Sequence, residues 1–154
     1  MSEAYIAGAG MIAFGRYPDR TYYQIGAEAA LLALDDCGLS IRDVGAVYAA
    51  SCFNAMSMLG QKVLKEIGQT GVPCINVSNA CASGATAVRE ATMAVKSGMV
   101  DVALAVGSEK NPRGMLGGAP AFGPPHSLGV PHAGRWEDVL CGHRSGGADA
   151  GRAR

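Results

Sequence analysis

Apolar runs of strand length alternate along this chain with longer segments whose apolar residues recur at helical spacing. This alternation is typical of α/β proteins, in which a helix connects each strand to the next parallel one. It predicts a layered α/β fold of the order βαβαβαβ. The four predicted strands cover about Ala4 to Met11, Val44 to Ser51, Cys74 to Val77 and Val100 to Val106.

Three helices are predicted between these strands. They cover about Tyr22 to Cys37, Met58 to Ile67 and Cys81 to Lys96, and Gly38 and Gly98 follow the first and the third. A glycine after a helix favours its end, because glycine adopts the left-handed conformation that closes the last turn. With 154 residues, 49% of them apolar, the chain can bury one core of ordinary size.

The composition changes after Lys110. Residues 111–154 contain 10 of the 22 glycines and 5 of the 7 prolines, and no periodic apolar pattern continues there. Such a segment buries too little apolar surface to offset the entropy lost on folding. The sequence therefore predicts a folded domain over residues 1–110 and an irregular, Gly/Pro-rich tail over residues 111–154.

Charge and cysteine content limit the expected partners and sites. Thirteen basic and thirteen acidic residues give no net charge, so we expect no nucleic-acid partner. No apolar run approaches the roughly 20 residues of a membrane span, so none is expected. The five cysteines form no C-x-x-C pair, which indicates neither a zinc site nor a disulfide framework and favours a reducing, cytoplasmic setting.

One cysteine, Cys81, stands where a strand is predicted to give way to a helix, in the stretch VSNACASG. Its position predicts that Cys81 lies on the first turn of that helix, with Ser78 or Asn79 as the N-cap. Unpaired backbone N–H groups and the helix dipole favour a thiolate at such a place, and the small neighbours leave space around the sulfur. Cys81 is therefore the candidate nucleophile; the alternative is a small, inert, buried side chain.

A second motif, Gly8-Ala9-Gly10-Met11-Ile12-Ala13, fits the dinucleotide-binding pattern G-x-G-x-x-A. That pattern must open a helix at once, whereas Pro18 delays the start of any helix. The acid that should end the second strand is also missing, since Asp35 and Asp36 fall inside the first predicted helix. We therefore expect these glycines to form a tight turn, and we expect no bound cofactor.

Three stretches together resemble the N-terminal half of the thiolase family, in particular its sterol-carrier-protein and lipid-transfer branch. They are AGAGMIAFGRYPDR (Ala7 to Arg20), GVPCINVSNACASG (Gly71 to Gly84) and SGMVDVALAVGSEK (Ser97 to Lys110). The resemblance covers about residues 4 to 110 and implies the first half of a five-layer αβαβα fold. It also implies that Cys81 accepts an acyl group from coenzyme A as a thioester.

The activity implied by the resemblance is that of an acyl-CoA acyltransferase in lipid or sterol metabolism. An acyl-CoA thioester would be the substrate, and the chain would form a dimer or pair with a partner subunit. The family takes an activating histidine (H-x-x-x-N-x-x-G-G) and a second cysteine (C-x-G) from a second half, and neither motif occurs here. The histidines and the last cysteine lie in the predicted tail: His126, His132, His143 and Cys141. We therefore expect an incomplete site, as in a truncated or frame-shifted product or a shortened relative.

Two other functions fit the same resemblance. One is a non-catalytic half-thiolase subunit or lipid-transfer partner, whose exposed sheet edge pairs with another chain. The other is a retro-aldolase that acts on acyl-CoA thioesters. Glu109 lies just beyond the last predicted strand, and we expect it to be either a structural group that supports the site or a surface carboxylate.

Overall fold

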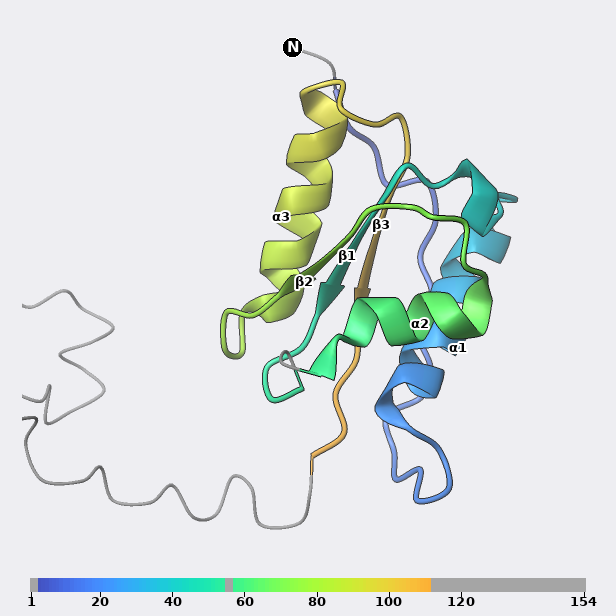
Figure 1. Cartoon of the computed structure of the whole chain (residues 1–154), viewed down its shortest axis with the longest axis vertical. Coiled ribbons are helices and arrows are strands. Elements are labelled where there is room, and N and C mark those ends of the chain that lie inside the picture. The colour runs from blue at the N-terminus through green and yellow to red at the C-terminus, as the bar shows by residue number, and fades with distance from the viewer. Residues whose placement is uncertain (1–2, 55–56, 112–154) are drawn as a thin grey trace, which may run out of the picture. The chain divides into compact units, whose positions relative to one another are not determined.

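A computed structural model describes residues 3–54 and 57–111, and its elements follow the predicted order with one exception (Figure 1). The elements are α1 (Tyr22–Asp36), the 3-10 turn η1 (Ile41–Asp43), β1 (Ala46–Ala50), α2 (Leu59–Ile67), β2 (Cys74–Val77), α3 (Ser83–Lys96) and β3 (Ala103–Gly107). The tail predicted for residues 111–154 lies outside the described residues, except for its first member.

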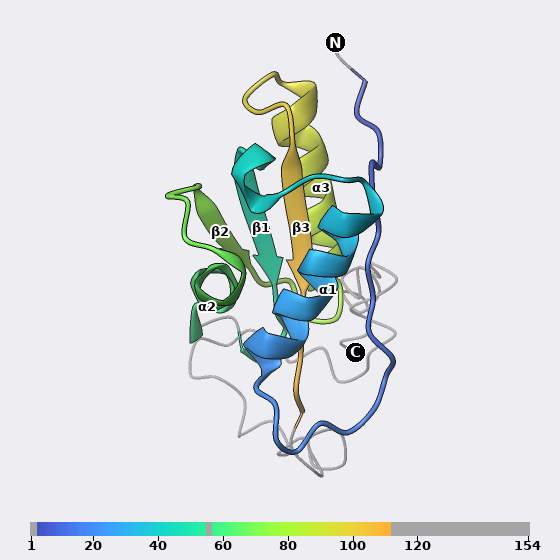
Figure 2. The same ribbon diagram turned by 90° about the vertical axis from the view of Figure 1, so that its right-hand side faces the viewer.

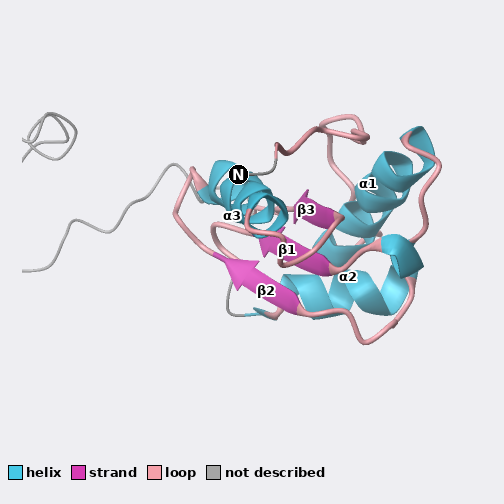
Figure 3. Cartoon of the chain, turned by 90° about the horizontal axis from the view of Figure 1, so that it is seen from above, coloured by secondary structure: helices cyan, strands magenta, loops and turns pink. Residues whose placement is uncertain are grey.

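The three strands form a parallel sheet in the order β2-β1-β3. Val47 in the central strand pairs with Cys74 on one side and with Leu104 on the other. Helices α1 and α2 cover one face of this sheet and α3 covers the other, as the view from above shows (Figure 3). The prediction of a layered α/β fold with a parallel sheet is therefore confirmed.

Alternate side chains of β1 fill two separate cores. Val47 and Ala49 pack on the α1 and α2 side, where Val47, Leu59 and Val63 are completely buried. The opposite face of β1 contacts α3 mainly through alanines, whose small side chains let the helix approach the sheet closely. These residues are Ala46, Tyr48 and Ala50 of β1 with Ala87, Ala91 and Ala94 of α3. Full burial of a valine or leucine contributes about 1.5–3 kcal/mol, so β1 anchors both layers.

Local sequence explains where the helices begin and end. Thr21 and Gln24 form a capping box at the start of α1: the Gln24 N–H donates to Thr21 Oγ1 (3.3 Å) and the Thr21 N–H to Gln24 Oε1 (2.9 Å). Gly38 (φ +68°) and Gly98 (φ +75°) adopt the left-handed conformation just beyond α1 and α3. Both glycine stops are confirmed.

The predicted first strand, Ala4 to Met11, is wrong, since this segment is extended but is not paired in the sheet. It runs beside α1 (Figure 2), and the Ala9 N–H donates to Asp36 Oδ2 (2.9 Å). A Cβ atom on Gly8 or Gly10 would lie only 2.4 Å from a backbone carbonyl oxygen of α1. The two glycines therefore serve close packing against α1 rather than a tight turn, and no helix begins until Tyr22, which leaves the dinucleotide pattern without its helix.

Candidate active site

The candidate site lies at the carboxyl edge of the sheet, where parallel strands of α/β proteins commonly present their ligand-binding loops. Three loops leave the sheet at this edge, which is the lower one in Figure 1. They follow β1 (residues 51–54), β2 (78–82) and β3 (108–111). The edge thus brings together residues that are about 30 positions apart in the sequence.

Cys81 lies in the loop after β2 and is exposed. The predicted N-cap is wrong, because α3 begins at Ser83 with Ala82 as its N-cap. Cys81 therefore stands directly before the N-cap rather than on the first turn. The thiol lies next to the amino end of α3 and is not buried among aliphatic side chains, so a reagent from solvent can reach it.

The Ser83 side chain builds the turn that carries Cys81. Ser83 is 4% exposed, and its Oγ accepts a hydrogen bond from the Asn79 N–H (2.8 Å) and donates one to the Ala80 carbonyl oxygen (2.6 Å). Ala80 has φ +44°, a left-handed conformation that costs energy for a residue with a Cβ atom. The Ala82 N–H closes the turn on the Asn79 carbonyl oxygen (2.9 Å). The buried hydroxyl thus stabilises a strained turn next to the thiol.

The amino end of α3 supplies positive potential near Cys81. The first N–H groups of a helix have no partner within the helix, and the aligned peptide dipoles add partial positive charge there. No acidic residue occupies the first turn of α3, and Ala82 has no side chain that could cap it. A Cβ atom on Gly84 would have no heavy atom within 4 Å, so open space adjoins this helix end.

Glu109 holds the loop after β1 against the end of β3. Its Oε2 accepts hydrogen bonds from Ser51 Oγ (3.0 Å) and from the backbone N–H groups of Cys52 (2.7 Å) and Phe53 (3.1 Å). Its Oε1 accepts from the Asn54 side-chain amide. One half-buried carboxylate therefore satisfies four donors of a single loop, which gives Glu109 a structural role at this edge.

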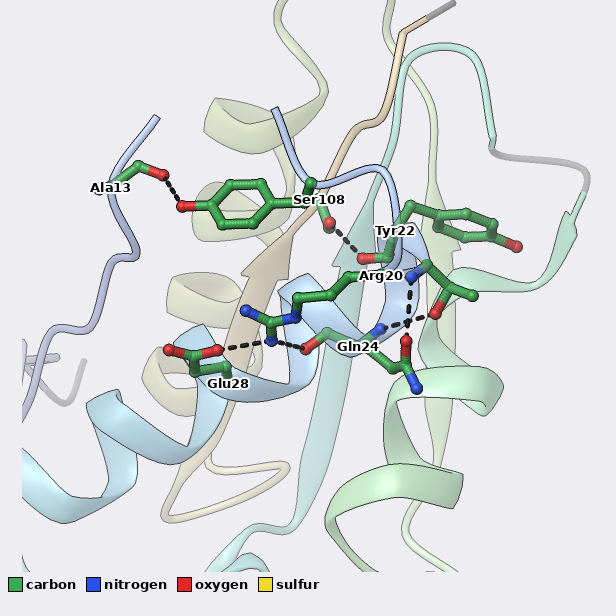
Figure 4. Close-up of polar contacts among 8 residues, drawn as sticks. Ala13, Arg20, Tyr22, Gln24, Glu28 and Ser108 are labelled. Atoms are coloured by element: carbon green, nitrogen blue, oxygen red, sulfur yellow. Dashed lines mark hydrogen bonds and ion pairs between the residues drawn. The ribbon is translucent and has the colours of Figure 1, made fainter. Parts of the chain in front are cut away.

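The neighbours of Glu109 secure the same strand end to the start of α1. Ser108 Oγ donates to the Tyr22 carbonyl oxygen (2.5 Å), a contact drawn in Figure 4. Lys110 Nζ donates to the carbonyl oxygens of Arg20 (2.6 Å) and Pro18 (3.2 Å). Three consecutive residues after β3 thus hold two different loops, which makes this strand end the anchor of the site.

A second polar chain holds the far end of the loop after β1. Lys62 Nζ donates to the Tyr22 hydroxyl (2.8 Å), which donates to Ser57 Oγ (2.7 Å). Ser57 Oγ in turn donates to the Asn54 carbonyl oxygen (2.6 Å). Side chains from α1 and α2 therefore fix the far end of this loop, and Glu109 fixes its start.

Cys52 is a second thiol at this edge, and it is half-buried beside Glu109 and Cys81. Partial burial raises the pKa of the Cys52 thiol, and the negative charges of Cys81 and Glu109 raise it further. Cys52 therefore keeps its proton at pH values at which an ordinary thiol begins to ionise. Cys74, at the opposite end of β2, has a pKa raised by burial alone.

The sequence singled out Cys81 and noted Glu109, but it missed Cys52 and Ser83. Cys52 could have been found because it follows β1 much as Cys81 follows β2, which places both at the same edge. No sequence signal identifies the Ser83 contact, because it depends on the conformation of Ala80. The nucleophilic role of Cys81 stays a prediction.

The described part of the chain has a cavity away from Cys81, but it offers no metal site and no membrane-spanning helix. A cavity of about 560 Å³ lies between the extended segment, α1, α3 and β3, but neither Cys81 nor Glu109 lines it. Within residues 3–54 and 57–111, no group of three or more His, Cys, Asp or Glu side chains could hold a metal ion. No helix in this part of the chain combines the length and the apolar character needed to cross a membrane.

Comparison with known proteins identifies relatives by sequence. The chain is 37% identical to non-specific lipid-transfer protein-like 2 of Caenorhabditis elegans over 122 residues, which cover 74% of this chain and 28% of that protein. It is 31% identical to human sterol carrier protein 2 over 120 residues, 76% of this chain and 22% of that protein. The benzoylsuccinyl-CoA thiolase subunit BbsB of Thauera aromatica is 37% identical over 111 residues, 71% of this chain and 28% of that subunit. The chain thus spans about a quarter of the length of these curated relatives.

A solved structure and a family model agree with these matches. The acetyl-CoA acetyltransferase from Syntrophomonas wolfei superposes with a TM-score of 0.58 at 21% identity, over 64% of this chain and 26% of that chain, which shows a common fold. The model of the thiolase N-terminal domain matches residues 4–113. The chain therefore belongs to the thiolase family, and its described part is the N-terminal thiolase domain with relatives of the sterol-carrier-protein type.

Proposed function

We propose that this chain accepts an acyl group from acyl-CoA on Cys81, as a thiolase-type acyltransferase of lipid or sterol metabolism. The observation that carries the proposal is the exposed thiol directly before the N-cap of α3, in a domain of the thiolase family. The Cys81 thiolate attacks the thioester carbonyl carbon, a new C–S bond forms, and the coenzyme A thiolate leaves. Coenzyme A enters as part of the substrate and not as a bound cofactor.

The proposal concerns only the first half-reaction, in which this chain by itself takes up an acyl group on Cys81. General acid–base catalysis contributes about 10²- to 10⁴-fold, and the family's histidine and second cysteine have no counterpart in this sequence. Only the amino end of α3 remains beside the Cys81 thiol. We therefore expect slow loading of one acyl group rather than efficient turnover.

The test is incubation of the purified chain with acetyl-CoA, followed by intact mass and peptide mapping. We expect a mass increase of one acetyl group on Cys81, and release of an equal amount of free coenzyme A. The Cys81→Ser variant should take up no thioester, whereas Cys74→Ala, which removes a thiol at the opposite edge, should load as the parent does. An acetyl group on Cys74 or on lysines, with Cys81 unmodified, would refute the assignment.

A second candidate is a non-catalytic subunit or lipid-transfer partner. The lipid-transfer name of the nematode relative supports the latter, and the Thauera aromatica relative is itself named as a subunit. Helix α3 exposes Val88 (52%) and Met93 (50%), two apolar side chains that another chain or another part of a longer protein could cover. Light scattering would measure whether the chain forms a dimer. An unmodified Cys81 together with a stable dimer would favour this candidate. Release of an aldehyde or ketone from a hydroxyacyl-CoA without free coenzyme A would instead favour a retro-aldolase.

A further inference from the structure

We propose that Cys52 and Cys81 are a disulfide-forming pair, which closes reversibly when the site meets a hydroperoxide. The thiols lie on neighbouring loops at the carboxyl edge of the sheet and are both free in this structure. One part of the proposal rests on the proposed function, namely that the disulfide blocks acyl loading on Cys81. The bridge itself depends on the placement of two loops.

The strand pairing brings the two loops side by side. Ala50 at the end of β1 is in register with Val77 at the end of β2, and the Ser51 N–H still donates to the Val77 carbonyl oxygen (3.3 Å). Neighbouring strands lie about 4.8 Å apart, and a disulfide joins Cα atoms that are about 4.4–6.8 Å apart. The end of this pair of strands is therefore at the right spacing for a bridge.

Tight turns keep each cysteine close to its strand end. In the loop after β1, the Asn54 N–H donates to Ser51 Oγ (3.0 Å), and the Cys52 N–H is fixed on Glu109. In the loop after β2, the turn closed by Asn79 and Ala82 carries Cys81. Neither cysteine can move far from the paired strands without the loss of these hydrogen bonds.

The charge of the Cys81 thiolate supports this placement, because it raises the pKa of the Cys52 thiol. Cys52 therefore lies next to the exposed Cys81, where a resolving thiol is needed. The other described thiols lie away from this edge: Cys37 follows the end of α1, and Cys74 begins β2. No comparable partner is thus available to Cys81 among the described residues.

The chemistry balances with hydrogen peroxide as the oxidant. The peroxide transfers one oxygen to the Cys81 sulfur and leaves as water, which gives a sulfenic acid. The Cys52 sulfur then attacks the Cys81 sulfur, the S–S bond forms, and the hydroxyl group leaves with the Cys52 proton as a second water. A dithiol returns two electrons and two protons and restores both thiols.

The test uses the whole chain with Cys74→Ala, because tryptic peptide 66–89 contains both Cys74 and Cys81. After limited peroxide treatment and alkylation, we expect peptide 43–62 joined to peptide 66–89, and release of both by dithiothreitol. Oxidised protein should take up no acetyl group from acetyl-CoA, and dithiothreitol should restore its loading. The proposal would be overturned if Cys52 remained open to alkylation while Cys81 became sulfinic acid. It would also be overturned if Cys81 were joined to Cys141.

A matched variant separates the bridge from simple oxidation. In Cys52→Ser, peroxide should carry Cys81 on to irreversible acids, so dithiothreitol should restore little of that variant's own starting acetyl uptake. Recovery as complete as in the parent would overturn the proposal. The two proposals also fail separately: a cross-link without acetyl uptake by reduced protein refutes only the acyltransferase, and acetyl uptake without a cross-link refutes only the pair.

Discussion

The Glu109 carboxylate accepts the backbone N–H of Cys52 at 2.7 Å, across 57 positions of sequence. This contact joins the end of β3 to the loop after β1, beside the loop that carries Cys81. The acceptor is charged and its donors include backbone groups of the loop, which cannot find another partner without a rearrangement. Hydrogen bonds to charged groups contribute about 1.5–3 kcal/mol each when they are removed one at a time.

Glu109→Gln should lower the free energy of unfolding by about 1.5–3 kcal/mol, because an amide cannot accept all four donors as a carboxylate does. Urea unfolding measures the change. Glu90→Gln is the matched control, since among the described residues Glu90 pairs only with its exposed neighbour Arg89, and it should cost less than about 0.5 kcal/mol. Equal stability of the two variants would contradict the anchoring role of Glu109.

Ser83→Ala should remove the support of the turn before α3. The substitution leaves the Asn79 N–H without its acceptor and removes one of the two hydrogen bonds that the Ala80 carbonyl oxygen accepts, so the free energy of unfolding should fall by about 1–3 kcal/mol. Acyl loading at Cys81 should slow as well, because the turn then loses its fixed conformation. Ser97→Ala is the control, since Ser97 Oγ donates to a backbone carbonyl at the other end of α3 (3.0 Å), and it should leave loading unchanged.

Gly84→Ala tests whether the open space beside α3 admits a substrate. The new methyl group meets nothing within 4 Å, and alanine favours a helix by up to about 1 kcal/mol, so the fold should be as stable or slightly more stable. Acetyl loading should nevertheless slow if acyl-CoA approaches there. Gly26→Ala provides the contrast, because its Cβ atom would lie 3.0 Å from Ser108 Cβ and should destabilise the fold. Unchanged loading in Gly84→Ala would place the substrate elsewhere.

Local signals in the sequence predicted most of the fold. The three helices and their glycine stops are encoded by residues within a few positions, and the central strand is a continuous apolar run. The segment from Ala4 to Met11 has the same apolar character, yet pairing needs a partner strand that the sequence does not specify. A side chain of α1, Asp36, takes the Ala9 N–H instead. An extended segment that packs on a helix therefore cannot be told from a strand by pattern alone.

The start of α3 was predicted to within two residues, at Cys81 instead of Ser83, while the nucleophilic role of Cys81 stays a prediction. The change from strand to helix near Cys81 is local, whereas the turn that moves the N-cap to Ala82 depends on the Ser83 hydroxyl and on the left-handed Ala80. Glu109 contacts residues that are more than 50 positions away in the sequence. These contacts depend on the order of the strands in the sheet, which the sequence pattern did not predict.

Gly10→Ala should detach the extended N-terminal segment from α1. The added Cβ atom would lie 2.4 Å from the Ala29 carbonyl oxygen, a rigid backbone group that cannot move aside. Overpacking of this kind costs about 1–3 kcal/mol, which is comparable with the contribution of the Ala9 hydrogen bond to the Asp36 carboxylate. Limited proteolysis within residues 3–13 should become faster. Gly15→Ala is the control, because its nearest contact would be an ordinary 3.7 Å to the Tyr17 ring, and its cleavage rate should not change.

The pH dependence of alkylation tests the charges around Cys52. Only the thiolate reacts with iodoacetamide, and the raised pKa of Cys52 means that its alkylation should rise at higher pH than that of an ordinary thiol. Cys81→Ser removes one of the two negative charges, so the pKa of Cys52 should fall and its alkylation curve should move to lower pH. Burial and Glu109 still act on Cys52, so the shift should be partial.

Cys74 serves as the internal control in the same sample. Its pKa is raised by burial alone, so its alkylation curve should stay in place when Cys81 is replaced. In Cys81→Ser the tryptic peptides separate the two thiols, with Cys52 in peptide 43–62 and Cys74 in peptide 66–89. A Cys52 curve that does not move, or one that moves together with that of Cys74, would show that the Cys81 thiolate does not act on Cys52. The two cysteines would then lie too far apart for the charge coupling and for the bridge that depends on it.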